Sequence, residues 1–508
     1  MPIIEPYAAF RRTYELPRLR GYTFLGTEAS ADKPIVTFDG RIEGWFDPAA
    51  HVPWIADAVA ADSFDLELVD GYLPALRYVY RKPGSREACE MVAFAADRAS
   101  TGAIHVYVRS IESAGGKVRR ASHFRLRDQA RVGDEQFTSE LSRLRSRWER
   151  FFRPRGAPKI ADPALLDACK ASIVRALITF TGKHSHYGVR SYGATVHDGF
   201  PPTIISLVDC LIDWGHAALA RDYLRYWFDR FMTQTGRIDY YGASLSEYGQ
   251  LLSLVRRLAN ATRSHDWLEH LRPKVKAMRE WLWAAQSASD TGLLTGVPEA
   301  DTCDEVDVYF HNNAWCWRGL QDIATVMPRR GEEARCDAFR KLILDAIAEV
   351  TDHGVEPPFI PPVARRMKPF ATMTQDRFAI YTNYRYWPEL LSSGMLSSEQ
   401  MQALVGYRVA HGGEAGGMTR FQHQADNWPI AHYAAALLDL GRVQDCERLL
   451  LSHVAGHMTD ETWTAYEQVS IEGKTYRGPS ADYCVPAQLV APRVAAWLAR
   501  GCPWARPR

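Results

Sequence analysis

The residues of this sequence that are best suited to chemistry are carboxylates in segments between predicted helices. One group comprises Glu299, Asp301, Asp304 and Glu305, and Glu467 lies much further along the chain. Hydrolysis of a glycosidic bond needs one carboxyl group that donates a proton to the leaving oxygen and a second that acts as a base. We therefore expect the fold to bring Glu467 across a cleft from a carboxylate of the first group.

Aromatic residues supply a second signal for sugars. The chain has 11% aromatic residues, with 15 Trp and 23 Tyr, and many lie in apparent loops beside Gly, Asp, Asn and His. Aromatic faces cover the C–H faces of a pyranose, and carboxylates and amides bind its hydroxyl groups. The pattern favours a sugar-binding surface, although any single aromatic residue is more often part of a core.

The predicted secondary structure that must position these residues changes from strands to helices along the chain. From about residue 20 to residue 135, short alternating runs broken by Gly, Pro, Asp and Ser are typical of an antiparallel β-sandwich. A helical period follows, with Leu141, Leu144, Trp148 and Phe151 on one face. We predict a β-sandwich domain over 1–134, a linker helix over 135–162 and a helical domain over 163–508.

The helical domain is predicted to be a closed barrel. Very short turns, such as Asp213-Trp214-Gly215 and Leu440-Gly441-Arg442, alternate with long connections rich in polar and aromatic residues. Short turns at one end and long loops at the other indicate a mainly α fold, an (α/α)6 barrel, rather than an open helical solenoid, with function carried by the long loops. The predicted helices are 163–181, 202–214, 217–234, 245–262, 266–288, 312–327, 332–351, 374–392, 397–410, 428–440, 442–458 and 484–499.

This order of domains resembles the six-hairpin glycoside hydrolases, which include the glucoamylase-like family 15 and families 63, 37 and 65. In glucoamylases the general acid lies between helices five and six, in a motif of the kind Pro-x-Tyr-Asp-Leu-Trp-Glu-Glu. The segment "PEADTCDE" matches it at Pro298, Asp301 and Glu305, and Asp304 stands where the family has its acid. The resemblance implies Asp304 or Glu305 as the acid, and Glu299 and Asp301 remain alternative donors.

The resemblance also implies a base after helix eleven. The segment "YEQVSIEGKTYRGPSADY" is similar to that part of the family, with Glu467, Gly473, Gly478, Ser480 and Tyr483 in the expected order. Glu467 would deprotonate the attacking water, which implies inversion of the anomeric centre with the two carboxyl groups roughly 6.5–9.5 Å apart.

Sugar-binding residues follow from the resemblance at one place and from position in the loops at the others. The family's Trp-x-Arg-Asp is matched in part by "TVHDGF", which makes Asp198 a candidate sugar ligand with His197 as its neighbour. Each further candidate could equally be structural. The further candidates are Tyr240, Tyr241, Glu247, Glu299, Asp301, His311, Asn312, Trp315, Arg318, Trp387, His423, Asp426, Trp428 and Tyr483.

Composition excludes several other classes of protein. Lys and Arg number 61 against 60 acidic residues, so no strong field favours nucleic acid or an anionic membrane. No apolar run is long enough for a secretory signal or a membrane span, and we expect a cytoplasmic protein, although a secreted chain whose leader had been removed would look the same. The nine cysteines contain no CxxC pair and no HExxH motif is present, so no metal or cofactor is expected.

The sequence thus predicts an exo-acting, inverting glycoside hydrolase that removes a terminal sugar from an oligosaccharide or glycoside. An oligomer is compatible with the sequence. The alternatives are an (α/α)-barrel polysaccharide lyase built on Tyr309, His311, Asn312 and Arg318, a phosphorylase of the same clan, and a carbohydrate-binding protein without catalysis.

Overall fold

The structure is a computed structural model. It describes residues 5–16, 18, 19, 21, 23–31, 33–36, 41–43, 51–53, 64–81, 84, 87–97, 104–115, 117–125, 130–188, 195–262, 266–460, 462–471 and 484–504. None of the described helices is both long enough and apolar enough to cross a membrane.

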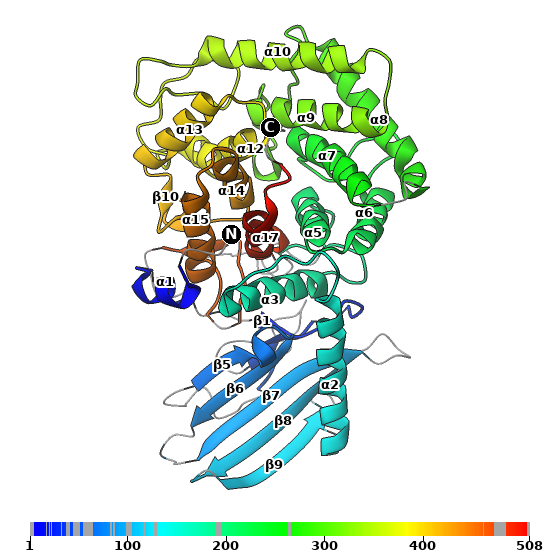
Figure 1. Cartoon of the computed structure of the whole chain (residues 1–508), viewed down its shortest axis with the longest axis vertical. Coiled ribbons are helices and arrows are strands. Elements are labelled where there is room, and N and C mark those ends of the chain that lie inside the picture. Colours follow the sequence, from blue (N-terminus) through cyan, green and yellow to red (C-terminus); the bar gives the residue numbers. More distant parts are fainter. Residues whose placement is uncertain are drawn as a thin grey trace.

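The amino-terminal region is built of antiparallel sheets. A meander of five strands contains β5 (Phe64–Leu68), β6 (Ala75–Arg81), β7 (Ala88–Asp97), β8 (Ile104–Ala114) and β9 (Lys117–Arg125). A smaller sheet contains β1 (Thr23–Phe24), β2 (Ile35–Val36), β3 (Arg41–Glu43) and β4 (His51–Pro53). Helix α2 (Asp134–Phe151) lies along the larger sheet, and a short helix α1 (Tyr7–Thr13) lies beside the helical region (Figure 1).

The remaining helices form a closed double ring above the sheet (Figure 1). Each inner element packs against the next, and α17 packs against α5, which closes the ring and excludes an open solenoid. The inner elements are α5 (Pro201–Asp213), α7 (Leu245–Ala261), α9 (Phe310–Val326), α11 (Arg377–Tyr381) with its continuation α12 (Trp387–Ser392), α14 (Ile430–Asp439), and α17 (Val490–Arg500) preceded by α16 (Val485–Gln488). The outer helices are α3 (Pro163–Thr179), α6 (Ala217–Phe231), α8 (Asp266–Ala288), α10 (Glu332–Val350), α13 (Ser398–Ala410) and α15 (Val443–Gly456).

The predicted (α/α)6 barrel and the antiparallel strands that precede it are confirmed by this architecture. Every predicted helix overlaps an observed one. The eighth differs in form, because a π-helical turn, η3 (Thr382–Tyr386), separates α11 from α12. Pro388 lies just after this turn and has no N–H to donate, which is one reason for the regular helical ladder to be interrupted here.

A small sheet at the rim of the barrel was not anticipated from the sequence. It contains β10 (Glu414–Ala415), β11 (Met418–Phe421), β12 (Gln424–Asp426) and β13 (Gln468–Ser470), which pair antiparallel in that order. Both contributing segments lie in connections between the predicted helices. Strands of two to four residues are too short to show the alternation by which strands are detected.

The inner helices α7 and α9 cross in very close contact. A Cβ atom added to Gly249 would lie 2.0 Å from the carbonyl oxygen of Trp315, and one added to Gly319 would lie 2.4 Å from the carbonyl oxygen of Gly249. Only glycine therefore fits at this crossing. The close approach fixes Glu247, near the start of α7, against the rest of the inner ring.

We predict that Gly249→Ala lowers the melting temperature. Alanine is favoured over glycine inside an isolated helix by about 1 kcal/mol, but forcing a methyl group into a filled crossing costs about 1–3 kcal/mol or more. Gly133→Ala is the matched control, because nothing lies within 4 Å of a Cβ atom at that position. Thermal melts of both variants test this, and a Gly249→Ala melting temperature equal to or above that of the wild type would contradict the described crossing.

Candidate active site

One buried pocket at the barrel rim brings together carboxylates from both of the predicted acidic segments. Glu299 and Glu467 both line it, and both side chains are almost fully buried. Its volume of about 20 Å³ holds little more than a single water molecule. The lining residues are Tyr187, His197, Phe200, Tyr240, Glu299, Ala300, Asp301, Tyr384, Trp428 and Glu467.

Glu299 is positioned by the loop that precedes α9. It caps a short 3₁₀ turn, η2 (Ala300–Thr302), and this turn lies against Gly242. Gly242 has φ +59°, and a Cβ atom there would lie 2.7 Å from Cα of Ala300, so glycine permits the two rim loops to touch. The loop thus directs the Glu299 side chain inward.

The electrostatic surroundings of Glu299 favour its protonated form. Burial raises its pKa to about 8, with Arg385 opposing and Asp301 adding to the rise. Oε2 accepts a hydrogen bond of 3.0 Å from Arg385, whereas Oε1 is buried and has no hydrogen-bond partner among the described residues. A carboxyl group in this state carries a proton near neutral pH and can donate it.

Arg385 binds the Glu299 side chain and two further carboxyl groups. It lies in the π-helical turn, is fully buried, and also donates to Glu247 at 2.7 Å and to Glu389 at 2.9 Å. Burial raises the pKa of Glu247 to about 7, and Arg385 opposes that rise. Sequence reasoning missed Arg385, although an Arg followed four residues later by Glu within an apolar helix indicates a buried ion pair.

Glu467 is positioned by the rim sheet. It directly precedes β13, and its backbone carbonyl is within 3.2 Å of Nε2 of His457. The pairing of β13 with β12 sets Asp426 opposite Gln468, which donates to the Asp426 carboxylate at 3.1 Å. Burial raises the pKa of Asp426 well above its usual value, and the charge of Glu467 adds to this effect.

Apart from Asp301, the remaining walls of the pocket are uncharged and mostly aromatic. His197 Nδ1 lies 2.5 Å from the Tyr240 hydroxyl, and Tyr241 lies 3.2 Å from the same nitrogen. Burial lowers the pKa of His197, so its ring is neutral at pH 7. Trp428 donates to the Tyr384 hydroxyl at 2.7 Å. These rings provide apolar faces together with hydroxyl and imidazole groups that can bind sugar hydroxyls.

The two residues that the resemblance offers as the acid lie elsewhere. Asp304 is exposed and does not line the pocket. Glu305 lines a separate groove of about 860 Å³ together with Arg365 and Phe378. The 3₁₀ turn after Glu299 carries the chain outward, and Glu299, which the sequence left as an alternative donor, lies in the pocket in place of Asp304 and Glu305.

Other predicted sugar ligands are held away from the pocket. Both carboxylate oxygens of Asp198 bond to imidazoles, at 2.8 Å to His184 and 2.7 Å to His186. Tyr241 is half exposed beside His197, and Glu247 is buried against Arg385. Asp426 lies behind Glu467 and does not line the cavity. Tyr240, Asp301 and Trp428 do line it.

Several of the predicted sugar-binding residues instead make structural contacts within the barrel. Asn312 accepts from Ser244 at 2.7 Å, and Arg318 bonds to Asp322 and to the carbonyl oxygens of Ser393 and Trp504. The indole N–H groups of Trp315 and Trp387 donate to backbone carbonyls. His311 is buried and stacks on Tyr386. His423 is exposed, and Tyr483, Gly473, Gly478 and Ser480 lie outside the described residues.

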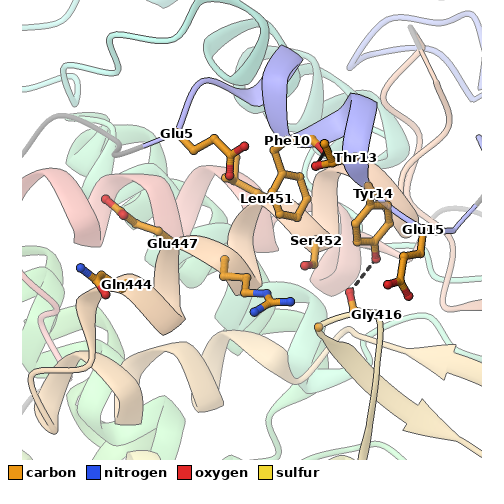
Figure 2. Close-up of a pocket in the computed structure, with 12 residues that line it drawn as sticks. Glu5, Phe10, Thr13, Tyr14, Glu15, Gly416, Gln444, Glu447, Leu451 and Ser452 are labelled. Carbon is orange, nitrogen blue, oxygen red and sulfur yellow. Dashed lines mark hydrogen bonds between the residues drawn. The ribbon is translucent and has the colours of Figure 1, made fainter.

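A wider cavity of about 670 Å³ lies between α1, α15 and the turn from β10 to β11. Figure 2 shows Tyr14 spanning it to Gly416, with a hydrogen bond of 2.7 Å from the hydroxyl to the carbonyl. Glu5 and Glu15, at its edge, are exposed. None of the predicted site residues lines this cavity, so it is not the candidate active site.

Comparison with known proteins identifies the fold. No family model and no curated protein matches the chain. A bacterial glucoamylase solved in complex with acarbose matches 97% of this chain and 95% of its own, with 9% identity and a TM-score of 0.57. A rhamnosidase from Klebsiella oxytoca with rhamnose bound covers 98% of this chain and 99% of its own, at 11% identity and a TM-score of 0.48. An alpha-mannanase from Bacteroides thetaiotaomicron covers 59% of this chain and 85% of its own, at 11% identity and a TM-score of 0.39.

The glucoamylase match, which spans nearly the full length of both chains, shows that this protein has the six-hairpin glycosidase fold.

Proposed function

We propose that this protein, which shares its fold with glycoside hydrolases, is an exo-acting, inverting glycoside hydrolase. The observation that carries the proposal is the presence of Glu299 and Glu467 in one buried pocket, with the pKa of Glu299 raised to about 8. A protonated and an ionised carboxyl group on either side of a scissile bond are the two groups that single-displacement hydrolysis needs.

In the proposed mechanism Glu299 is the acid. Its proton passes to the glycosidic oxygen as the bond to the anomeric carbon breaks, which leaves Glu299 as a carboxylate. Arg385, already bonded to Oε2, then stabilises the new charge. The unpartnered Oε1 is the atom that carries the proton to the substrate.

Glu467 is the proposed base. It takes a proton from the water that attacks the anomeric carbon from the face opposite the leaving group, so the first product has the inverted configuration. Asp426 acts as a positioning residue in this proposal. Burial and the neighbouring Glu467 raise its pKa well above the usual value, which favours its neutral form.

The pocket supports a neutral sugar as the substrate. Its ionisable side chains other than His and Tyr are the carboxyl groups of Glu299, Asp301 and Glu467, none of them cationic, and the pocket is too small for a pyranose as it stands. The rim loops must therefore open and close again around a sugar, a motion common in enzymes that exclude water. A pocket that closes around one ring favours removal of a terminal residue.

The lyase alternative fits this pocket poorly. A lyase must neutralise a uronate carboxylate, but the pocket is acidic, and Arg385 is already bound to three carboxylates. His197 could accept a proton, but burial raises the pKa of Tyr240 and keeps its hydroxyl protonated, and Asn312 and Arg318 are engaged in the scaffold. Nothing in the described pocket offers a uronate a cationic partner.

The charge of Asp301 should contribute to the alkaline limit of activity. Asp301 raises the pKa of Glu299, so Asp301→Asn lowers it, and kcat/KM then declines at a lower pH than in the wild type. Because Asp301 is exposed, the shift is less than about one pH unit and shrinks with salt. The exposed Asp304 provides the control, Asp304→Asn. An unchanged alkaline limit in Asp301→Asn would contradict Glu299 as the acid.

A screen of aryl glycosides and oligosaccharides tests the proposal. Turnover that releases a terminal sugar without added phosphate, and without an unsaturated product absorbing in the ultraviolet, is the expected result. The activity that remains in a Glu467→Gln preparation made in parallel measures the contribution of contaminating enzymes. Phosphate dependence would indicate a phosphorylase, an unsaturated product a lyase, and binding without turnover a carbohydrate-binding protein.

A further inference from the structure

Three metal-ligating side chains converge outside the pocket. His184 and His186 follow α3, and Asp198 lies shortly before α5, so the cluster joins the two ends of the connection between these helices. One ligand atom from each of His184, His186 and Asp198 lies within 4.8 Å of the other two. His186 and Asp198 are largely buried, and the His184 side chain is 24% exposed, which leaves a route for an ion.

Each imidazole is also held from its other side. His184 Nδ1 lies 3.2 Å from the Tyr226 hydroxyl, and His186 Nε2 lies 3.1 Å from Oγ1 of Thr181. Metal-binding imidazoles usually donate their second N–H to such an acceptor, which fixes the tautomer and the ring orientation. The arrangement thus supplies ligands together with the outer partners that orient them.

We propose that His184, His186 and Asp198 form a binding site for a divalent transition-metal ion of the zinc class. Two imidazole nitrogens and one carboxylate oxygen are a donor set that zinc accepts, with a water molecule as the fourth ligand. The sequence gives no warning of the site, because a His-x-His pair with a distant Asp matches none of the common motifs.

Binding requires a small rearrangement. Without metal, the imidazole N–H groups donate to Asp198 at 2.8 and 2.7 Å, whereas ligands of a tetrahedral zinc ion are about 3.3 Å apart. The carboxylate must therefore move outward by roughly half an ångström. On each imidazole the proton must leave the nitrogen that binds the ion, and the other nitrogen then donates to Tyr226 or Thr181.

The bound ion would stabilise the connection between α3 and α5 and would take no part in the reaction. None of its ligands lines the active-site pocket, but Asp198 directly follows His197, which does. An ion at this position ties the ends of the connection together and fixes His197 against Tyr240. Chelation is expected to lower stability first and activity only through the displacement of His197.

Metal content tests the proposal. Tag-free protein is stripped with a chelator, incubated with Zn²⁺ or Co²⁺, desalted and analysed by inductively coupled plasma mass spectrometry. We expect one ion per chain, a rise in melting temperature with Zn²⁺, and visible absorption typical of tetrahedral Co²⁺. His184→Gln combined with His186→Gln should abolish all three effects. His270→Gln, which alters an exposed imidazole paired with Asp229, should retain them.

Two results would overturn the site. One is wild-type protein that retains no ion after incubation, and the other is an ion that the double variant retains in full. A double variant that fails to fold would also lose the ion. For this reason X-ray absorption is measured on the zinc-loaded wild type, where it reports the ligands directly. It should show two imidazole nitrogens at about 2.0–2.1 Å, and a sulfur-rich shell would place the ion on cysteines instead.

Discussion

Replacing Glu467 with Gln is expected to lower kcat by about 10²–10⁴-fold on every substrate, whatever its leaving group. The amide keeps the size of the side chain but cannot take a proton from the attacking water. Because water attack is needed for all substrates, a better leaving group does not restore the rate. Steady-state kinetics on two glycosides of the same sugar measure this effect.

Glu305→Gln is the matched control for that variant. Glu305 is also a rim carboxylate, but it lines the separate groove with Arg365. Its replacement should leave kcat within a few-fold of the wild type. If Glu305→Gln abolished turnover while Glu467→Gln retained it, with both variants folded, the assignment of the pocket would fail.

Replacing Glu299 with Gln is expected to produce a loss that depends on the leaving group. On a phenyl glycoside the fall in kcat/KM should be about 10²–10⁴-fold, because the departing oxygen needs a proton. On the 2,4-dinitrophenyl glycoside of the same sugar the fall should be slight, since that phenolate leaves without one. The decline of activity above pH 8, which follows from the raised pKa of Glu299, should also disappear.

Asp304→Asn serves as the comparison for Glu299→Gln, because the resemblance to glucoamylases offers Asp304 as the acid. An exposed residue outside the pocket should show no dependence on the leaving group. An equal loss on both substrates in Glu299→Gln would mean that Glu299 supports the structure of the site and does not donate the proton.

The scaffold was predictable because its signals are local and repeated. Three features together require hairpins of helices. They are the amphipathic periods, the short turns such as Leu440-Gly441-Arg442, and the long connections that alternate with these turns. Closure of the ring through α17 and α5 follows once six such hairpins curve in one direction. The crossing at Gly249 and Gly319 was not predictable, because a glycine inside a helix does not reveal which neighbour approaches it.

The candidate site was predictable by segment but less so by residue. Glu467, His197, Tyr240 and Trp428 line the pocket as the sequence suggested. The choice among the carboxylates from 299 to 305 depends on the direction of each side chain around the turn η2, which spacing alone does not determine.

Long-range contacts determine the rest of the site. Arg385 contacts Glu299 from within a π-helical turn, and the pairing of β12 with β13 brings Asp426 near Glu467. Both depend on segments far apart in the chain. Sequence patterns describe each segment by itself and therefore do not reveal such meetings.

The anomeric configuration of the first-formed sugar is the most direct test of the paired roles of Glu299 and Glu467. Proton NMR of the wild-type reaction, recorded before mutarotation, should show the product with the configuration opposite to that of the substrate. A product that retains the configuration would mean that a carboxylate attacks the sugar itself, and the proposal that Glu467 activates water would be refuted.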